Sequence, residues 1–218
     1  MKSDVELRKA VLDELDWEPR INSSRIAVVL EDGIATLSGE VESYAEKETA
    51  FRAASRVFGV RGVADELKVR LPDYDERTDA DIARSAANAI AWTASVPADC
   101  VKVVVENGWV TLEGEVNWQF EKEAAEASVA SLRGIVGISN DIVVRPVVEG
   151  LDVKSRIDDA FERHAQIDAK RIYVETKGTT ITLRGKVSSC LERNEAERVA
   201  WATPGVTDVE NWLVVTPD

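Results

Sequence analysis

The chain has 218 residues, of which 44% are hydrophobic and 31% are charged, and its formal net charge at neutral pH is −13. This composition is that of an ordinary globular protein, and no run approaches the roughly 18 apolar residues that span a bilayer. The acidic excess opposes binding to nucleic acid or to an anionic membrane by charge attraction alone. Any contact with lipid therefore needs apolar or locally basic surface.

The N-terminal residues 1–19 carry acidic side chains where an export signal has its apolar segment, and no small-residue cleavage site follows. We therefore expect a cytoplasmic protein, or a periplasmic one if a leader precedes Met1 in the natural protein. Cys100 and Cys190 lie far apart and outside any metal-ligand spacing. Two free, partly buried thiols are expected rather than a disulfide.

One short phrase occurs three times: GIATLSGEV from Gly33, GWVTLEGEV from Gly108 and GTTITLRGKV from Gly178. The register set by the first two copies extends without a gap over their flanking residues, and a slightly shorter register relates the second copy to the third. Repetition at a fixed period indicates duplicated structural units. We predict three repeats, called repeat 1 (1–71), repeat 2 (76–146) and repeat 3 (150–218). Short linkers at 71–78 and 145–150, with Pro72 and Pro146, favour repeats that touch.

Each repeat opens with apolar residues four positions apart. This spacing predicts an amphipathic helix whose apolar face packs on a sheet. The three stripes are Leu7, Val11 and Leu15; Ile82, Ala86 and Ile90; and Val153, Ile157 and Phe161.

A β-branched run follows at 26–30, 101–105 and 172–176, then a turn ending in glycine, then the repeated phrase. Asp-Gly and Asn-Gly between apolar runs are strong hairpin signals, so the phrase is predicted to be the second strand. Alternation puts Leu37 and Val41 toward the helices and Thr36 and Ser38 away from them. Gly39, on the helix side, is expected to leave room for a helix.

A second helix is predicted to begin near Ser43, near Asn117, and near Ser188 or Ser189. Ser43 with Glu46, and Ser189 with Glu192, have the spacing of capping boxes. Alanine-rich runs follow, and a last apolar strand closes each repeat. The predicted order is α-β-β-α-β.

This pattern resembles the BON domain family, and it covers nearly the whole chain. In repeat 1 the residues are Asp4, Leu7, Val11, Leu15, Ile26, Val28, Gly33, Leu37-x-Gly39-x-Val41, Ala50, Gly59-Val60 and Asp65-x-Leu67-x-Val69. The later copies have Gly134-Ile135 with Asn140-x-Ile142-x-Val144, and Gly205-Val206 with Asn211-x-Leu213-x-Val215. The resemblance implies an α+β fold, each repeat having a three-stranded mixed sheet with two helices on one face. It also implies binding to phospholipid or at the envelope in osmotic stress, without catalytic residues.

Signals for an enzyme are weak. The single histidine, His164, is expected at a helix end or facing solvent, and no nucleophile elbow, phosphate loop or dinucleotide motif is found. Nothing in the spacing brings His164 to Cys190. A cation near Asp65, Asn140 and Asn211 is conceivable, but the loop pattern of a calcium site is missing, which favours turn capping. We expect no catalytic residue, no metal and no cofactor.

The tryptophans give the sharper signal. Trp17 and Trp92 share one position at the end of the first helix and are expected at the rim of the core. Strand alternation puts Trp109 and Trp212 on the helix-free faces of their sheets, where apolar side chains indicate a contact surface. The predicted interaction surface comprises Trp109 with Val104 and Val143, Trp212 with Tyr173 and Val214, and Trp118; Trp201 is a further possible member.

Two hypotheses follow. The first is a non-enzymatic bacterial stress or envelope-associated protein that binds phospholipid or a membrane surface. The second is a scaffolding protein whose repeats bind one another, a second copy or a protein partner, so that the apolar faces meet inside the chain or in an oligomer. Binding to nucleic acid is not expected.

Overall fold

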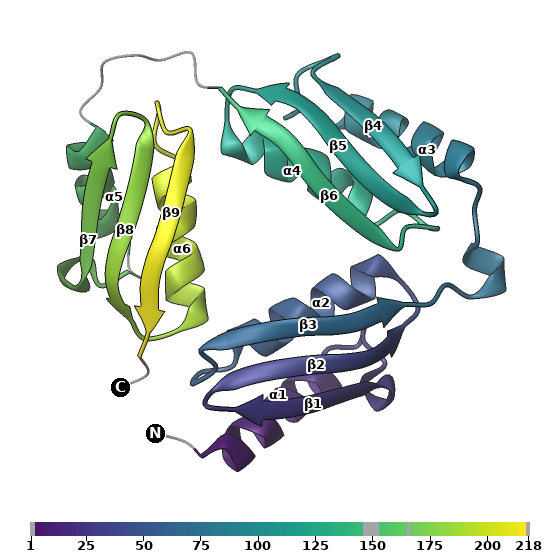
Figure 1. The fold of residues 1–218 in the computed structure, drawn as a ribbon, viewed down its shortest axis with the longest axis horizontal. Helices are drawn as coiled ribbons and strands as arrows, with labels where there is room; N and C mark the ends of the chain where they lie inside the picture. The colour runs from purple at the N-terminus through teal and green to yellow at the C-terminus, as the bar shows by residue number, and fades with distance from the viewer. Residues whose placement is uncertain (1–2, 146–152, 165–166, 217–218) are drawn as a thin grey trace.

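The computed structural model describes residues 3–145, 153–164 and 167–216, and it confirms three consecutive α-β-β-α-β repeats (Figure 1). Repeat 1 contains α1 (Asp4–Trp17), β1 (Ile26–Glu31), β2 (Ile34–Val41), α2 (Tyr44–Arg56) and β3 (Gly62–Val69). Repeat 2 contains α3 (Asp79–Trp92), β4 (Val101–Glu106), β5 (Trp109–Val116), α4 (Gln119–Ala130) and β6 (Gly137–Val144). Repeat 3 contains α5 (Val153–Arg163), β7 (Ile172–Lys177), β8 (Thr180–Val187), α6 (Cys190–Trp201) and β9 (Asp208–Val215).

Each sheet has three strands, and the repeated phrase forms the central one. The hairpin partner is antiparallel to it and the last strand of the repeat is parallel to it, so the sheets are mixed as predicted. In repeat 1, for example, Leu37 lies between Val28 and Asp65. The crossover from the second strand to the parallel third strand runs through the second helix, as a parallel connection requires.

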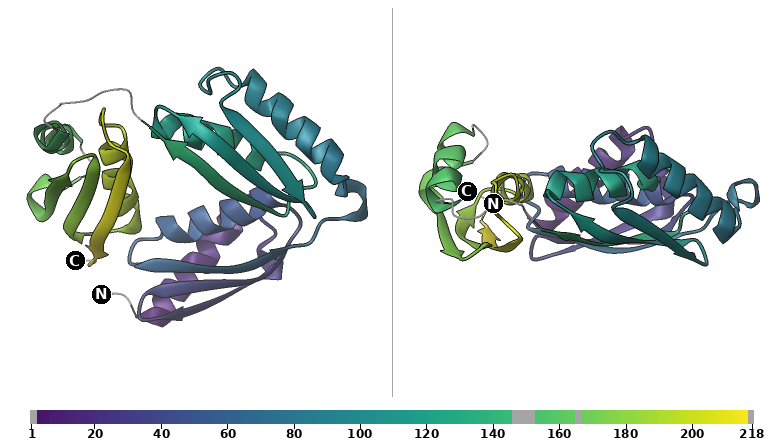
Figure 2. Two further views of the ribbon diagram at one scale, coloured as in Figure 1. Left: turned by 45° about the horizontal axis from the view of Figure 1, so that its top comes forward. Right: turned by 90° about the horizontal axis from the view of Figure 1, so that it is seen from above.

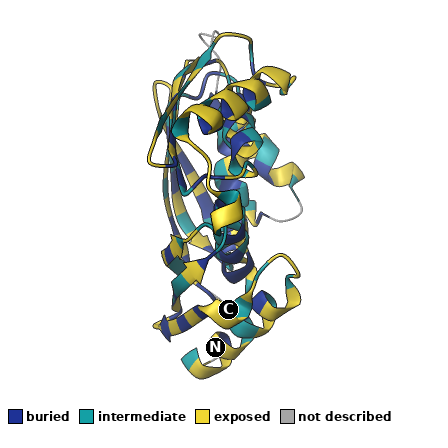
Figure 3. Cartoon of the chain, turned by 90° about the vertical axis from the view of Figure 1, so that its right-hand side faces the viewer, coloured by how far each residue is buried: buried dark blue, intermediate teal, exposed yellow. Residues whose placement is uncertain are grey.

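The predicted helix stripes are buried, and each repeat has a core of its own between its two helices and its sheet. Buried and exposed side chains alternate along the strands, which Figure 3 shows as blue and yellow bands. One face of each sheet therefore packs on helices and the other face carries none.

The glycine of the repeated phrase is required for a reason other than the predicted one. Gly39, Gly114 and Gly185 have φ angles of 128°, 147° and 135°. A Cβ on these residues would lie 2.1, 2.0 and 2.1 Å from the backbone carbonyl oxygen of the residue just before the neighbouring strand, which is Arg25, Cys100 and Arg171 respectively. The glycine thus makes room for backbone in its own sheet rather than for a helix, and its positive φ strongly disfavours other residues.

Half of each predicted capping box is present at the N-termini of α2 and α6, where Ser43 and Ser189 accept hydrogen bonds from the amides of Glu46 and Glu192. The glutamates bind the amides of Glu42 and Ser188, one residue before the capping serine. In α4 the N-cap position is held by Trp118, one residue later than Asn117, and its backbone amide donates to Glu121. The three glutamates at the third helical position, Glu46, Glu121 and Glu192, are buried. Each carboxylate accepts a backbone N–H group from the chain that enters its helix, at 2.7–3.0 Å. Glu46 and Glu192 also accept the amides of Asn22 and Asp168, which lie in the loop before the first strand of their repeats.

The repeats touch, as the short linkers predict. Tyr44 at the start of α2 packs into the core of repeat 2, and burial together with the nearby carboxylate of Glu48 raises the pKa of its hydroxyl. Helices α2 and α6 are in contact, and the thiol of Cys190 donates a 3.2 Å hydrogen bond to the carbonyl of Val60. The second linker falls almost wholly outside the described residues.

Together the repeats form a flat triangle, with the three sheets along one side and the helices along the other (Figure 2). We call the three helix-free sheet faces the sheet side of the molecule. Within the described ranges, no helix is both long enough and apolar enough to cross a membrane.

Candidate interaction surface on the helix-free sheet faces

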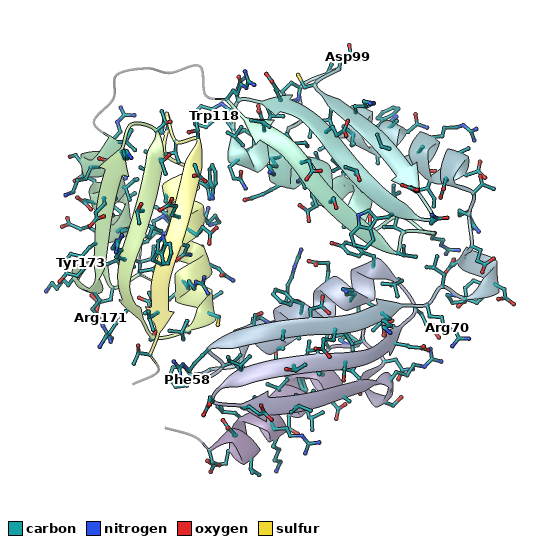
Figure 4. The ribbon with its side chains drawn as sticks, viewed as in Figure 1. Phe58, Arg70, Asp99, Trp118, Arg171 and Tyr173 are labelled. Carbon is teal, nitrogen blue, oxygen red and sulfur yellow. The ribbon has the colours of Figure 1, made fainter. Side chains whose placement is uncertain are left out.

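The outward positions predicted from strand alternation are exposed on the sheet side, where side chains project toward the viewer in Figure 4. Trp109 is 48% exposed and Trp212 is 64% exposed. The exposed set also includes Val104, Val143, Tyr173 and Val214. The two tryptophan-bearing faces therefore do not meet inside one chain. Their role as a contact surface stays a prediction.

Trp109 lies across its own sheet at the turn end of the β4–β5 hairpin, where it pairs with Glu106. Its ring covers Gly137 on β6, where a Cβ would lie only 2.3 Å from the ring, and its Nε1 donates a 2.9 Å hydrogen bond to the hydroxyl of Ser139. Glycine at this point lets the indole lie flat and pack on backbone. The ring is fixed in place while its upper face stays open to solvent.

The predicted partners of Trp109 do not all lie beside it. Val104 faces Thr111 in the next row of the sheet, close to the indole. Val143 faces Glu115, which is six residues further along β5 and so about 20 Å away at the rise of a strand. A row formed by Lys102, Glu113 and Asp141 lies between them. The outer face of repeat 2 is thus interrupted by charge.

In repeat 3 the aromatic side chains share one row. Tyr173, Arg184 and Trp212 pair across β7, β8 and β9, and the next row has Lys186 beside Val214. Tyr173 is 67% exposed, and Figure 4 places it at the edge of this sheet. Tyr173 and Trp212 were predicted from the sequence, but Arg184 between them and Lys186 in the next row were not. Strand alternation alone would have identified them.

Two glutamates border this row. Glu175 forms an ion pair with Arg184 at 3.4 Å, and both side chains are exposed. Glu210 accepts hydrogen bonds from Trp212 Nε1 at 3.3 Å and from the hydroxyl of Thr182 at 3.1 Å. Exposed ion pairs contribute little free energy because water solvates both charges well. Arg184 can therefore exchange its carboxylate for another anion.

Trp118 is part of a different feature from the sheet rows. Figure 4 places it where repeats 2 and 3 approach each other. Its ring stacks near Phe120, with centroids 6.3 Å apart, and together with Trp201 these rings line a groove of about 240 Å³. Glu123 and Arg198 complete its polar part. The two tryptophans that interrupt small-residue positions thus meet at an inter-repeat junction.

The prediction for Trp17 and Trp92 is wrong. These residues end α1 and α3, and they are 84% and 88% exposed rather than packed at the rim of the core. The apolar stripes of both helices fill the space against the sheet with Leu15 and Ile90, and the tryptophans, two positions later, lie roughly 200° further around the helix. Helical spacing therefore accounts for the exposure of both tryptophans.

The candidates for chemistry have structural partners. His164 follows the last residue of α5, as expected, and its Nδ1 lies 3.2 Å from Glu195. Both cysteines are free; burial raises the pKa of the Cys190 thiol, which faces Val60. Among the described residues, no group of three or more His, Cys, Asp or Glu side chains has the arrangement of a metal site.

The polar position of the last strand ties that strand to the second helix. Asn140 donates to the carbonyl of Lys122 and to the carboxylate of Glu126, both at 3.0 Å, and Asn211 repeats these contacts with α6. Asp65 instead pairs with Lys47 at 3.2 Å. All three also accept the amide two residues ahead, as expected for a local cap.

Comparisons with known proteins match this architecture. The family model of the BON domain matches residues 3–70, 78–146 and 151–217. Osmotically-inducible protein Y of Escherichia coli (strain K12) is 35% identical over 143 residues, which are 62% of this chain and 67% of the relative.

Among solved structures, CdsD, a structural protein of the type III secretion system of Chlamydia trachomatis, aligns over 98% of this chain and 93% of its own, with 13% identity and a TM-score of 0.25. The PrgH periplasmic domain aligns over 94% and 99%, with 10% identity and a TM-score of 0.23. Scores this low carry no inference about this chain.

Proposed function

The chain belongs to the BON domain family and is related to osmotically-inducible protein Y, and from this premise we propose that it is a non-enzymatic stress-response protein that binds phospholipid or envelope surfaces through its sheet side. The observation that carries the proposal is the exposure of Trp109 and Trp212 on faces that share one side of a flat molecule (Figure 2). Tryptophan has an apolar body and a polar N–H, which suits the boundary between lipid and water.

The arrangement of the sheets supports a broad contact rather than a pocket. Three helix-free faces on one side of the triangle can approach an extended surface together, whereas a small ligand needs a concave site. Trp109 and Trp212 come from different repeats, so two anchors would engage the same surface. Two weak contacts on one rigid body bind more tightly than either does alone.

Co-sedimentation of the full chain with lipid vesicles tests the proposal. The change is Trp109→Ala with Trp212→Ala in one chain, and we expect vesicle binding to fall about tenfold or more, since burying an indole in the interface is favourable by 1 kcal/mol or more. The matched control is Trp17→Ala with Trp92→Ala, which removes two exposed indoles at helix ends.

Two outcomes contradict the proposal. Absence of binding to any vesicle at any salt concentration removes lipid as the target. Loss of binding in the helix-end variant, with full binding retained in the sheet-side variant, assigns the lipid contact to Trp17 and Trp92 instead.

A scaffolding role is the second candidate, and the contacts between repeats favour it. Tyr44 joins the core of repeat 2, and Cys190 bonds to repeat 1, so BON repeats in this chain have surfaces that fit one another. If copies of the chain associate through their sheet sides, light scattering will report a stable oligomer. Iodide will then quench Trp109 and Trp212 poorly. A monomer with both indoles accessible excludes self-association through the sheet side.

A further inference from the structure

The outer face of repeat 3 reverses the charge that repeat 2 carries at the same places. Arg184 and Lys186 stand on β8 where β5 has Glu113 and Glu115, and each pair flanks the glycine of the repeated phrase. Repeat 1 has Ser38 and Glu40 at these positions. The change from acid to base affects two neighbouring outward residues of one strand, while the inward residues stay apolar.

The ion-pair partner of the second of these outward residues differs between the repeats as well. In repeat 2 the second glutamate, Glu115, pairs with Arg145 at 2.9 Å, and in repeat 1 Glu40 pairs with Arg70 at 3.3 Å. Thr216 occupies the corresponding place after β9. Lys186 forms no ion pair with any residue in the described part of the chain, so its charge is available to a partner.

The side chains beside the cations also change in kind. Tyr173 and Trp212 take the places of Lys102 and Asp141, so the charged row of repeat 2 becomes a row of tyrosine, arginine and tryptophan. Val214 lies next to Lys186. We call these five residues, Tyr173, Arg184, Lys186, Trp212 and Val214, the basic row of repeat 3.

We propose that the basic row is the part of the sheet side that meets a bilayer, and that it selects anionic phospholipid headgroups; this inference rests on the proposed function. Arginine and lysine bind phosphate oxygens, and each cation near an anionic leaflet adds about 1 kcal/mol of attraction. Tyrosine and tryptophan anchor at the same depth as the headgroups. The row is flat and exposed, which fits a surface rather than a free anion in a pocket.

The acidic character of the chain makes this localisation necessary. A net charge of −13 repels an anionic leaflet, but the repulsion from charges more than a Debye length away, about 8 Å at physiological salt, is largely screened. Cations that touch the headgroups act at much shorter range. Glu113, Glu115 and Asp141 would meet the same leaflet from repeat 2 with the opposite sign.

The test compares vesicles of phosphatidylcholine with vesicles that also contain phosphatidylglycerol, using the full chain. Arg184→Glu with Lys186→Glu gives β8 the outward charges of β5, and both sites are exposed, so circular dichroism and thermal melting should match the parent. We expect the parent to prefer the anionic vesicles and the variant to bind them at least about thirtyfold less, because two cations of about 1 kcal/mol each are lost. Arg184→Lys keeps the charge and should keep most of the binding.

The outcomes separate this inference from the proposed function. If the parent binds both kinds of vesicle equally, or if the charge-reversal variant binds anionic vesicles as the parent does, the basic row is not the selective contact, while lipid binding itself stands. If the parent binds neither kind of vesicle, the proposed lipid target is overturned along with the inference. Binding that falls with the charge reversal and survives Arg184→Lys supports the basic row.

Discussion

Repeats 2 and 3 have the same strand order, the same buried stripes and the same buried glutamate, yet their outward rows differ in sign and character. Where β4, β5 and β6 place Lys102, Glu113 and Asp141 side by side, β7, β8 and β9 place Tyr173, Arg184 and Trp212. Inward positions are restricted by packing, because changes of even one methylene in a core are destabilising. Outward positions carry no such restriction. The difference therefore locates specialisation on the outer face.

The largest expected effect tests the framework that the two repeats share. Gly114→Ala and Gly185→Ala each introduce a Cβ about 2 Å from a backbone carbonyl oxygen at positive φ. We expect each to destabilise its repeat by about 4 kcal/mol, from backbone strain plus overpacking, and hydrogen exchange resolved by repeat measures this. Gly178→Ala is the control, since its φ is +63° but no atom lies within 4 Å of the added carbon. If the control loses as much stability, the close carbonyl is not the reason for the glycine.

Replacement of the buried glutamates should destabilise repeat 3 more than repeat 2. Glu192 accepts hydrogen bonds from the amides of Asp168 and Ser188 and from the Ser188 hydroxyl, whereas Glu121 accepts two amides. We expect Glu192→Gln to lower the free energy of unfolding of repeat 3 by about 2–3 kcal/mol, because a charge-assisted network loses its anion. Glu121→Gln should lower that of repeat 2 by less. Urea unfolding monitored by repeat-resolved exchange checks this order, and equal losses would contradict it.

Glu192 also gives repeat 3 a dependence on pH. Burial raises the pKa of this carboxyl, but hydrogen bonds from Asp168 and Ser188 outweigh burial, so the net pKa lies below its ordinary value. A folded-state pKa below the unfolded one, about 4.3, means that the contribution is complete above that pH and is lost as pH falls through the folded value. Unfolding measured across this acid range should show a shallower loss in Glu192→Gln. An unchanged acid slope would exclude Glu192 as the group responsible.

A smaller effect concerns the hairpins. Asp79 accepts the amides of Asn107 and Gly108, both at 2.9 Å, and Asp4 does the same in repeat 1, whereas the aligned residue of repeat 3 is Gly150, outside the described residues. We expect Asp79→Ala to cost about 1–2 kcal/mol, because two turn amides lose a charged acceptor. The amides of Asn107 and Gly108 should then exchange with solvent faster. Unchanged exchange in the variant would show that the aspartate does not hold the turn.

The smallest expected change in stability comes from substitutions on the outer face of the sheet. Arg145→Ala removes an exposed ion pair with Glu115, and we expect a change in the free energy of unfolding of less than about 0.5 kcal/mol. Stability unaffected by such changes is what allows repeats to differ in outward charge. A loss as large as that of a buried position, seen in urea unfolding, would mean that the outer rows are restricted by folding and that their divergence says nothing about binding.

Most of the fold could be predicted from the sequence, because each apolar position occurs three times and the three repeats can be compared. Leu7, Val11 and Leu15 are buried as their spacing predicts, and strand alternation placed Trp109 and Trp212 outward correctly. The role of Gly39 could not be predicted, because the carbonyl of Arg25 that it accommodates is brought near only by strand pairing.

Helical spacing explains the exposure of Trp17, because this residue lies two positions past Leu15 and roughly 200° further around α1. Contacts between repeats were harder to predict for a physical reason. Trp118 and Trp201 share a groove because two repeats approach each other, which no pattern within a repeat contains. The basic row could have been predicted, because strand alternation places Arg184 and Lys186 on the outward side of β8. A comparison of the outward charges of the three repeats identifies it.

Quenching of single tryptophans by nitroxide-labelled lipid tests the central claim most directly. In a chain that keeps only Trp212, with the other five of the six tryptophans changed to phenylalanine, we expect strong quenching on binding to vesicles that contain phosphatidylglycerol. A chain that keeps only Trp109 should be quenched less, because the acidic side chains of Glu113, Glu115 and Asp141 lie further along its sheet face. Bound protein whose Trp212 is not quenched, or is quenched less than Trp17 or Trp92 in their own single-tryptophan chains, would contradict the assignment of the membrane contact to repeat 3.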